Sequence, residues 1–248
     1  RAVILASETF SVTRSKWNGL PVSLIPVTGR PVIEHALRFL CSDDSIGNIH
    51  ICTGSNGYQQ FIEWLRGCDY TGRVEPFNGN HNTGGIVTEL LNFTSKKNIQ
   101  EDLLVLPGDH IPDFPAGPFL RFCAEKDGDV VGVVKGRSQG ATIRCGFAAV
   151  TSRDRVIGFE IDPPKPKSNL IAFPLVKLSA ATIPFLSEYI LDGNDTRCIG
   201  SFLAWSYRIR PLYAFLQDGG SYKMLKEAPL RKISSGKIYQ ANLAPINR

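Results

Sequence analysis

Cysteine and histidine are the residue types in this sequence whose possible chemistry depends most directly on spacing. No C-x-x-C pair occurs, and no histidine lies at zinc-ligand spacing from a cysteine. The histidines form no triad pattern with a serine or cysteine, which argues against a hydrolase of either kind. We therefore interpret the thiols as reduced and mostly buried, with a disulfide as the alternative. The residues concerned are Cys41, Cys52, Cys68, Cys123, Cys145, Cys198, His35, His50, His81 and His110.

The bulk composition is that of a globular protein. The 248 residues are 43% hydrophobic and 21% charged, and we expect one domain spanning residues 1–248. The net charge of +5 suits phosphorylated small molecules, and no Lys/Arg block indicates nucleic acid. No apolar run approaches the ~20 residues that cross a bilayer, so we expect a cytoplasmic protein without membrane contact. Because Met224 is the only methionine, we expect the sequence to lack at least its initiator residue.

Strands and helices are predicted to alternate along most of the chain. The apolar run Ala2–Ala6 is followed by helical spacing from Val32 to Leu40 and then by the run Asn48–Cys52. Pro31 fits the first turn of this helix, where its missing N–H has no partner to lose. This alternation predicts an α/β fold with a mostly parallel sheet covered on both faces. Further helices are expected near 58–66, 83–93, 119–125, 180–191, 199–207 and 222–228, and strands near 74, 103–106 and 212–216.

A strand-rich insertion is predicted at about residues 129–177. Apolar segments at 129–135, 145–150, 156–160 and 170–177 are divided by polar turns. No internal repeat or low-complexity segment occurs, so we expect the insertion to belong to the same domain.

Several segments together resemble the sugar-1-phosphate nucleotidyltransferases, also called NDP-sugar pyrophosphorylases. These enzymes join an NTP to a sugar 1-phosphate and release pyrophosphate. The resemblance implies a GT-A-like, Rossmann-like nucleotide-binding fold with a mostly parallel mixed sheet flanked by helices. The segments lie in a common order along nearly the whole chain: Leu5-Ala6, Pro26 to His35, Leu104 to Asp109, Gly158 to Glu160, Ser168 to Leu170, and Leu178-Ser179.

The phosphate-binding loop implied by this resemblance has different residues here. The family has a G-x-G-T-R loop and a nearby lysine, whose backbone N–H groups and cations hold the phosphates. An ungapped alignment places residues 7–12 on that loop and Val22 on the lysine, with Glu8 and Phe10 opposing phosphate. Arg14 and Lys16 on the same loop could provide catalytic phosphate binding from another direction. The alternative is a solvated basic loop.

A helix start at Asn82-Thr83-Gly84-Gly85 occupies the place of the family's base-binding stretch. The resemblance implies that Thr83, Gly84 and Gly85 bind the nucleotide. The alternative is an ordinary helix start, in which Asn82 or Thr83 caps free N–H groups and the glycines allow close packing.

Asp109 follows the predicted strand 103–106, where the resemblance implies a carboxylate that binds Mg²⁺. The alternative is an aspartate that caps the turn. The family's second metal carboxylate aligns with residues 221–225, where Lys223 or Met224 stands in its place. An ammonium or a thioether is a poor ligand for a hard cation.

The sugar-site region implied by the resemblance includes Gly146 and Glu160. The family's E-K-P stretch becomes Ile161-Asp162-Pro163, so that an acid replaces the lysine that meets the sugar phosphate. Lys165 or Lys167 could compensate if their loop has moved. Downstream, larger side chains at residues 171–174 would fill part of the pocket.

These differences favour a non-catalytic member of the family, a pseudoenzyme with a regulatory, scaffolding or ligand-sensing role. Loss of one preorganised charge-stabilising group commonly costs ~10²–10³ in rate, and several are changed here. The pattern resembles the degenerate domains of translation-initiation exchange factor subunits and of regulatory partners of sugar pyrophosphorylases. A nucleotide or sugar nucleotide, a protein partner, or a second copy of the chain would then be bound.

Two catalytic alternatives stay open. One is an atypical Mg²⁺-dependent sugar-phosphate nucleotidyltransferase, with phosphate binding by Arg14, Lys16 and Arg30 and metal binding by Asp109. The other is a GT-A glycosyltransferase that uses Asp109 and Asp113, although their spacing differs from a D-x-D motif.

Overall fold

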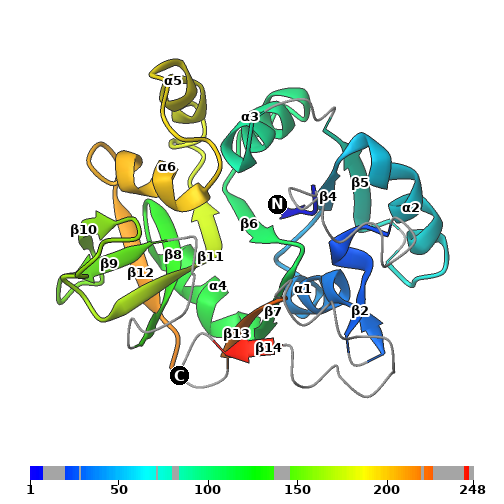
Figure 1. Cartoon of the computed structure of the whole chain (residues 1–248), viewed down its shortest axis with the longest axis horizontal. Coiled ribbons are helices and arrows are strands. Elements are labelled where there is room, and N and C mark those ends of the chain that lie inside the picture. The colour runs from blue at the N-terminus through cyan, green and yellow to red at the C-terminus, as the bar shows by residue number, and fades with distance from the viewer. Residues whose placement is uncertain are drawn as a thin grey trace.

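The computed structural model describes residues 1–7, 20–27, 29–70, 72–79, 84–136, 146–218, 221–225 and 243–245. Within these ranges the chain alternates between strands and helices, as Figure 1 shows. Arg14, Lys16 and Thr83, for which site roles are predicted, lie outside the described residues, as does Cys145.

A central sheet runs through the molecule in the order β12-β8-β11-β6-β1-β4-β5. β11 is antiparallel to both of its neighbours in this order, and the other neighbouring strands are parallel to one another. The predicted mostly parallel mixed sheet is therefore confirmed. Its strands are β1 (Ala2–Leu5), β4 (Ile49–Thr53), β5 (Val74–Asn78), β6 (Leu103–Pro107), β8 (Asp129–Lys135), β11 (Leu170–Leu178) and β12 (Leu212–Leu216).

The predicted strand-rich segment adds a hairpin to one end of this sheet. β9 (Phe147–Val150) and β10 (Val156–Glu160) pair antiparallel, and β9 also pairs with β11. Arg155, next to β10, forms a bridge with Tyr213 of β12. The strands β8, β11, β9, β10 and β12 thus connect into a ring.

Helices cover both faces of the sheet because successive strand residues point to opposite sides. In β1, Ala2 and Ile4 pack in the core beneath α1, α2 and α4, whereas Val3 and Leu5 pack in the core beneath α3, α5 and α6. Figure 1 shows α1 and α4 on one side of the sheet and α3, α5 and α6 on the other. The helices are α1 (Val32–Cys41), α2 (Ser55–Arg66), α3 (Ile86–Lys96), α4 (Ala116–Glu125), α5 (Phe185–Leu191) and α6 (Ile199–Ser206).

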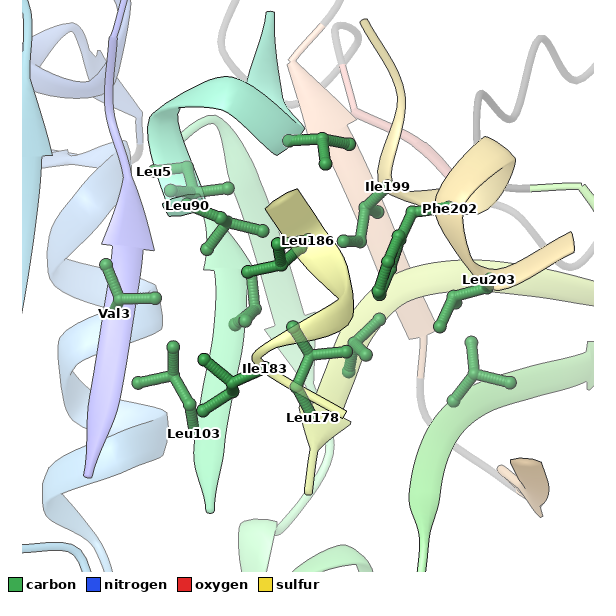
Figure 2. Packing of buried hydrophobic residues seen from close by; sticks show 14 of the residues in the cluster. Val3, Leu5, Leu90, Leu103, Leu178, Ile183, Leu186, Ile199, Phe202 and Leu203 are labelled. Atoms are coloured by element: carbon green, nitrogen blue, oxygen red, sulfur yellow. The ribbon is translucent and has the colours of Figure 1, made fainter. Parts of the chain in front are cut away.

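The core under α3, α5 and α6 joins the two halves of the sheet (Figure 2). Leu90 of α3, Leu186 of α5 and Phe202 of α6 are fully buried against strand residues such as Val3 and Leu178. Burial of one such side chain contributes roughly 1.5–3 kcal/mol. These helices are therefore fixed against the strands whose ends form the candidate site.

A small second sheet corrects one prediction. Residues 222–228 were expected to form a helix, but Ser221–Leu225 is the strand β13, which pairs with β7 (His110–Asp113) and β14 (Leu243–Pro245). Pairing with a strand that is distant in sequence overrides local helix propensity here. The remaining short elements are the 3₁₀ helix η1 (Val22–Leu24) and the pair β2 (Pro26–Val27) and β3 (Arg30–Pro31).

Several helix starts differ by a few residues from the predictions, including those of α2, α4 and α5. Pro31 ends β3 and immediately precedes α1, so it is the residue before the first turn. α3 begins at Ile86 instead of about Thr83.

The five described cysteines are free thiols. Cys52 and Cys123 are buried, while Cys41, Cys68 and Cys198 are partly exposed. No helix among the described residues is both long and apolar enough to cross a membrane.

Candidate functional site

The strand order creates a switch point between β1 and β6. After β1 the chain continues to β4 and β5 on one side, and then returns to β6 on the other side of β1. In open α/β sheets, ligands bind outside the carboxyl ends of the strands at such a point. We call the edge where β1, β4, β5 and β6 end the carboxyl edge, and the opposite edge the amino edge. Leu5 and Pro107, which end β1 and β6, are paired in register, so both exits meet at the carboxyl edge.

Gly108 holds the turn after β6 against the exit of β1. Its N–H donates to the carbonyl of Leu5 at 2.7 Å. A Cβ atom at this position would lie 2.6 Å from Oγ of Ser23 and 3.1 Å from Cβ of Ala6. Only glycine fits this approach without a shift of its neighbours, and the approach fixes Asp109 at the switch point.

Asp109 forms a close pair with the residue that follows it. Nδ1 of His110 lies 2.7 Å from Oδ1 of Asp109, and 10% of the His110 side chain and 22% of the Asp109 side chain are exposed. In β13, Met224 is the register partner of His110, and Lys223 is the partner of Ile111. The segment that the resemblance aligns with the second metal carboxylate therefore runs beside the strand that follows the Asp109 turn.

The residues at this turn do not fit a Mg²⁺ site with two carboxylates. Oδ1 of Asp109 already faces His110, and the neighbouring strand has Lys223 and Met224 where a second acid would be needed. Within the described ranges, no group of three or more His, Cys, Asp or Glu residues is arranged to hold a metal ion. We derive no chemical step through a metal.

The glycines at the start of α3 pack against the loop before α6. Gly85 has a φ of +122°, and a Cβ there would lie 2.8 Å from Cα of Arg197. The Thr196 hydroxyl donates to the carbonyl of Gly84, and the Thr196 carbonyl accepts from the N–H of Val87 at 3.0 Å. The Thr196 backbone thus occupies one free N–H of the α3 N-terminus. These contacts match the close-packing interpretation of Gly84 and Gly85, and their nucleotide role stays a prediction.

Glu89 is a buried acid at the carboxyl edge that the sequence interpretation missed. It lies in the first turn of α3, its residue is 4% exposed, and its Oε2 accepts a hydrogen bond from Oγ of Ser7. Its Oε1 is buried and has no hydrogen-bond partner among the described residues. Burial raises the pKa of Glu89 to about 7, partly offset by the Ser7 hydrogen bond, so the group titrates near neutrality. The signal in the sequence was a single acid within the apolar run from Ile86 to Phe93.

The predicted sugar-site residues gather around the β9–β10 hairpin. Gly146 has a φ of +103°, and a Cβ there would lie 2.7 Å from the carbonyl oxygen of Glu160. The Glu160 carboxylate accepts a hydrogen bond from the backbone N–H of Lys167 at 3.0 Å and lies 3.4 Å from its Nζ. Glu160 therefore closes the loop 161–167 onto its own strand. Lys165 is exposed on this loop.

The loop before α6 lies between the predicted nucleotide-binding residues at the start of α3 and the predicted sugar-site residues. Thr196 contacts Gly84 and Gly85, as described above. Burial and the nearby carboxylates of Asp162 and Asp195 raise the pKa of the Cys198 thiol. The sugar-site loop and the start of α3 therefore approach the same short segment.

The amino edge contains a second buried acid, Asp129, at the start of β8. Its Oδ1 accepts a hydrogen bond from the backbone N–H of Ser179 at 2.8 Å. Burial raises its pKa to about 6, opposed by hydrogen bonds from Ser179 and Thr182 and by the charge of Lys177. Nζ of Lys177 lies 3.2 Å from Oδ2 of Asp102 and donates to the carbonyls of Cys123 and Lys126. This cluster ties β8 and β11 to the end of α4.

Comparisons with known proteins identify solved structures with the same fold, but no match in sequence. No family model matches the chain, and no curated protein matches it in sequence. A protein from Bacillus anthracis, assigned as a glucose-1-phosphate thymidylyltransferase and crystallised with sucrose, superposes with a TM-score of 0.75 at 20% identity over 97% of this chain and 98% of its own. The inositol-1-phosphate CTP transferase of T. maritima gives a TM-score of 0.76 at 12% identity, over 96% and 93% of the two chains. A UDP-glucose pyrophosphorylase in complex with UDP-glucose gives 0.71 at 14% identity, over 90% and 91%.

These similarities confirm the expected nucleotidyltransferase-like, Rossmann-like fold. They extend over nearly the whole chain and nearly the whole of each of these structures. At identities of 12–20% they show the fold alone. What the site does must be argued from its own residues.

Proposed function

We propose that this chain is a nucleotidyltransferase-like domain that binds a nucleotide or sugar nucleotide at its switch point without catalysing nucleotidyl transfer. It would act as a ligand-sensing, regulatory or scaffolding protein in the cytoplasm. The observation that carries the proposal is the pairing of Asp109 with His110 beside the strand β13, in which the register partners of His110 and Ile111 are Met224 and Lys223 and not an acid. We treat residues 1–248 as one domain in which residues 129–177 form the sugar-side insertion.

Electrostatics at the carboxyl edge support binding without turnover. Nucleotidyl transfer needs cations that stabilise the charge developing on the departing pyrophosphate. The described part of the switch point contributes two acids, Asp109 and Glu89, one histidine that is paired with Asp109, and Lys223 on the neighbouring strand β13. The sequence lacks the family's glycines, arginine and lysine after β1. Binding can survive such changes, whereas the rate of transfer depends on them directly.

The sugar side supports the same conclusion. Glu160 is engaged by Lys167, and the acid Asp162 stands where the family has a lysine that meets the sugar phosphate. A partner protein or a second copy of the chain would recognise the ligand-bound form of the protein. Mg²⁺ would be needed only if the chain were an active transferase.

Thermal unfolding with a panel of ligands tests the binding half of the proposal. The panel contains ATP, GTP, CTP, UTP, dTTP, UDP-glucose, ADP-glucose and GDP-mannose, each with Mg²⁺ and with EDTA. We expect at least one ligand to raise the Tm, because a ligand at ~100 times its Kd adds about 2.7 kcal/mol of stability. This increase in Tm should persist when EDTA replaces Mg²⁺. No shift with any ligand would refute nucleotide binding.

Pyrophosphate release tests the catalytic half. The protein is incubated with each NTP, Mg²⁺ and a set of sugar 1-phosphates, and wild type is compared with Asp109→Asn. We expect both proteins to stay at the background rate. Release by wild type that falls ~10²-fold or more in Asp109→Asn would instead show an active nucleotidyltransferase that uses this carboxylate.

A further inference from the structure

Glu89 lies at the carboxyl edge, in the first turn of α3 and beside the exit of β1. It connects two elements of the carboxyl edge, because its carboxylate on the first turn of α3 accepts the hydroxyl of Ser7 just after β1. The residue is 4% exposed, and in the part of the chain that the structure describes Oε1 is buried without a hydrogen-bond partner. A buried carboxylate with one accepted hydrogen bond is costly to ionise.

Among the described residues, the groups that interact with Glu89 carry no positive charge. Ser7, just after β1, donates its hydroxyl, and β4 carries the thiol of Cys52. Burial and the charge of Glu89 both raise the pKa of that thiol well above its usual value. α5 and α6 also pack against α3; Tyr189 lies on α5, and Cys198 immediately precedes α6. Burial raises the pKa of Tyr189 to about 12 and also raises that of Cys198, so both stay neutral at pH 7.

Two described cations close to the ends of α3 belong to other pairs. Lys97, at the far end of α3, lies 3.3 Å from Glu75, and Arg197, in the loop before α6, forms two side-chain hydrogen bonds with Asp195. Glu89 has no ion pair with any described residue. Its ionisation is therefore sensitive to any new charge at the carboxyl edge.

We propose that Glu89 couples the binding of an anionic nucleotide at the switch point to the uptake of one proton. This inference rests on the proposed function, since it needs a ligand at that site. A ligand's negative charge near Glu89 favours the protonated carboxyl, and by reciprocity a protonated Glu89 favours the ligand. The uncharged carboxyl also gains a hydrogen-bond donor.

Isothermal titration calorimetry with an NDP-sugar tests the coupling. UDP-glucose, ADP-glucose and GDP-mannose are suitable probes because their pyrophosphate oxygens do not titrate near neutrality. Each titration is repeated at pH 6, 7 and 8 in buffers of different ionisation enthalpy, which reports the number of protons taken up. We expect uptake approaching one proton at pH 8, and about tenfold weaker binding at pH 8 than at pH 6.

Glu89→Gln isolates the group that takes up the proton. Glutamine keeps the size of the side chain and its hydrogen bond with Ser7 while removing the charge. We expect Glu89→Gln to bind at pH 8 as tightly as wild type does at pH 6, with no proton uptake. Asp129→Asn is the matched control, since it removes the other acid with a raised pKa but at the amino edge, and it should keep the wild-type uptake.

Ser7→Ala provides a second variant if Glu89→Gln folds poorly. The Ser7 hydrogen bond lowers the pKa of Glu89, so its loss should move the pH midpoint of the coupling upward. Binding without proton uptake, or unchanged uptake in Glu89→Gln, would overturn this inference and leave the proposed function standing. Absence of binding to wild type and to Glu89→Gln at every pH would overturn the proposed function, and this inference with it.

Discussion

Asp129 at the amino edge and Glu89 at the carboxyl edge are buried acids with different surroundings. At the amino edge, Asp129 lies close to a cation, Lys177, and Lys177 is itself held by Asp102 and two backbone carbonyls. At the carboxyl edge, Glu89 accepts one hydroxyl and no described cation pairs with it. Natural folds tend to satisfy local rules except at functional or strained places. Each acid keeps one buried carboxylate oxygen without a hydrogen-bond partner among the described residues. The amino edge places a cation near its acid, whereas the described part of the carboxyl edge does not.

The largest effect that we expect at the amino edge follows from Lys177→Met. The change leaves the carbonyls of Cys123 and Lys126 without their donor in a buried place. We expect the free energy of unfolding to fall by about 4 kcal/mol, most of it from these carbonyls because Asp102 is half exposed and can be solvated. Urea unfolding measures the change. A loss below 1 kcal/mol would mean that the amino edge is not stabilised in this way.

At the carboxyl edge, Glu89→Gln should increase stability at alkaline pH. Burial raises the folded-state pKa of Glu89 from 4.5 to about 7, so the folded protein binds this proton more tightly than the unfolded chain. The stability linked to that proton is complete below pH 4.5 and is lost as the pH rises through 7. Glutamine avoids this loss, and we expect a gain of about 3 kcal/mol at pH 8 and nearly none at pH 4.5. Equal effects of Glu89→Gln on stability at both pH values would contradict a raised pKa of Glu89 in the folded protein.

Gly108→Ala should disturb the carboxyl edge through packing alone. The new Cβ would meet Ser23 at 2.6 Å and Ala6 at 3.1 Å, and we expect a loss of about 2 kcal/mol from overpacking. Ser23→Ala in the same chain should recover part of the loss because it removes the closest atom. Gly158→Ala is the control, since its Cβ would lie 3.7 Å from the nearest side chain and should change stability little. Failure of the double variant to recover stability would show that the Ser23 contact is not the cause.

The smallest effect is expected for Lys167→Met on the sugar-side loop. Its side chain is 85% exposed and its ion pair with Glu160 faces solvent. Such pairs contribute about 1 kcal/mol or less, so the unfolding free energy should change by no more than that. Because Lys177 and Lys167 both pair with an acid, the two variants separate the effect of burial from that of charge. A loss as large as that of Lys177→Met would remove the contrast between the two sites.

Much of the fold could be predicted because the relevant signals are local. The apolar run at β1 and the helical spacing of α1 follow from neighbouring residues, and both elements occur as expected. The strand before Asp109 was likewise predicted from its apolar run, whereas the switch point at which Asp109 lies is visible only in the strand order. The helix predicted at 222–228 failed because β13 pairs with β7, more than a hundred residues earlier in the chain.

Two features of the candidate site could not be predicted for the same reason. Gly85 contacts Thr196 and Arg197, and Glu89 contacts Ser7, so each depends on a residue far away in the sequence. A burial-induced rise in pKa cannot be recognised until the surrounding elements are in place. The roles of Arg14, Lys16 and Thr83 remain predictions.

The ring of strands at one end of the sheet has a consequence for solubility. There the bridge between Arg155 and Tyr213 joins the hairpin to β12, so this end does not offer a long unpaired strand. At the other end, β5 pairs only with β4 among the described strands. An outer strand with one unpaired side can recruit a strand from another molecule. β5 contains Pro76, which lacks an N–H, next to the charged Glu75. The sheet therefore discourages open-ended self-association at the end where it is least enclosed.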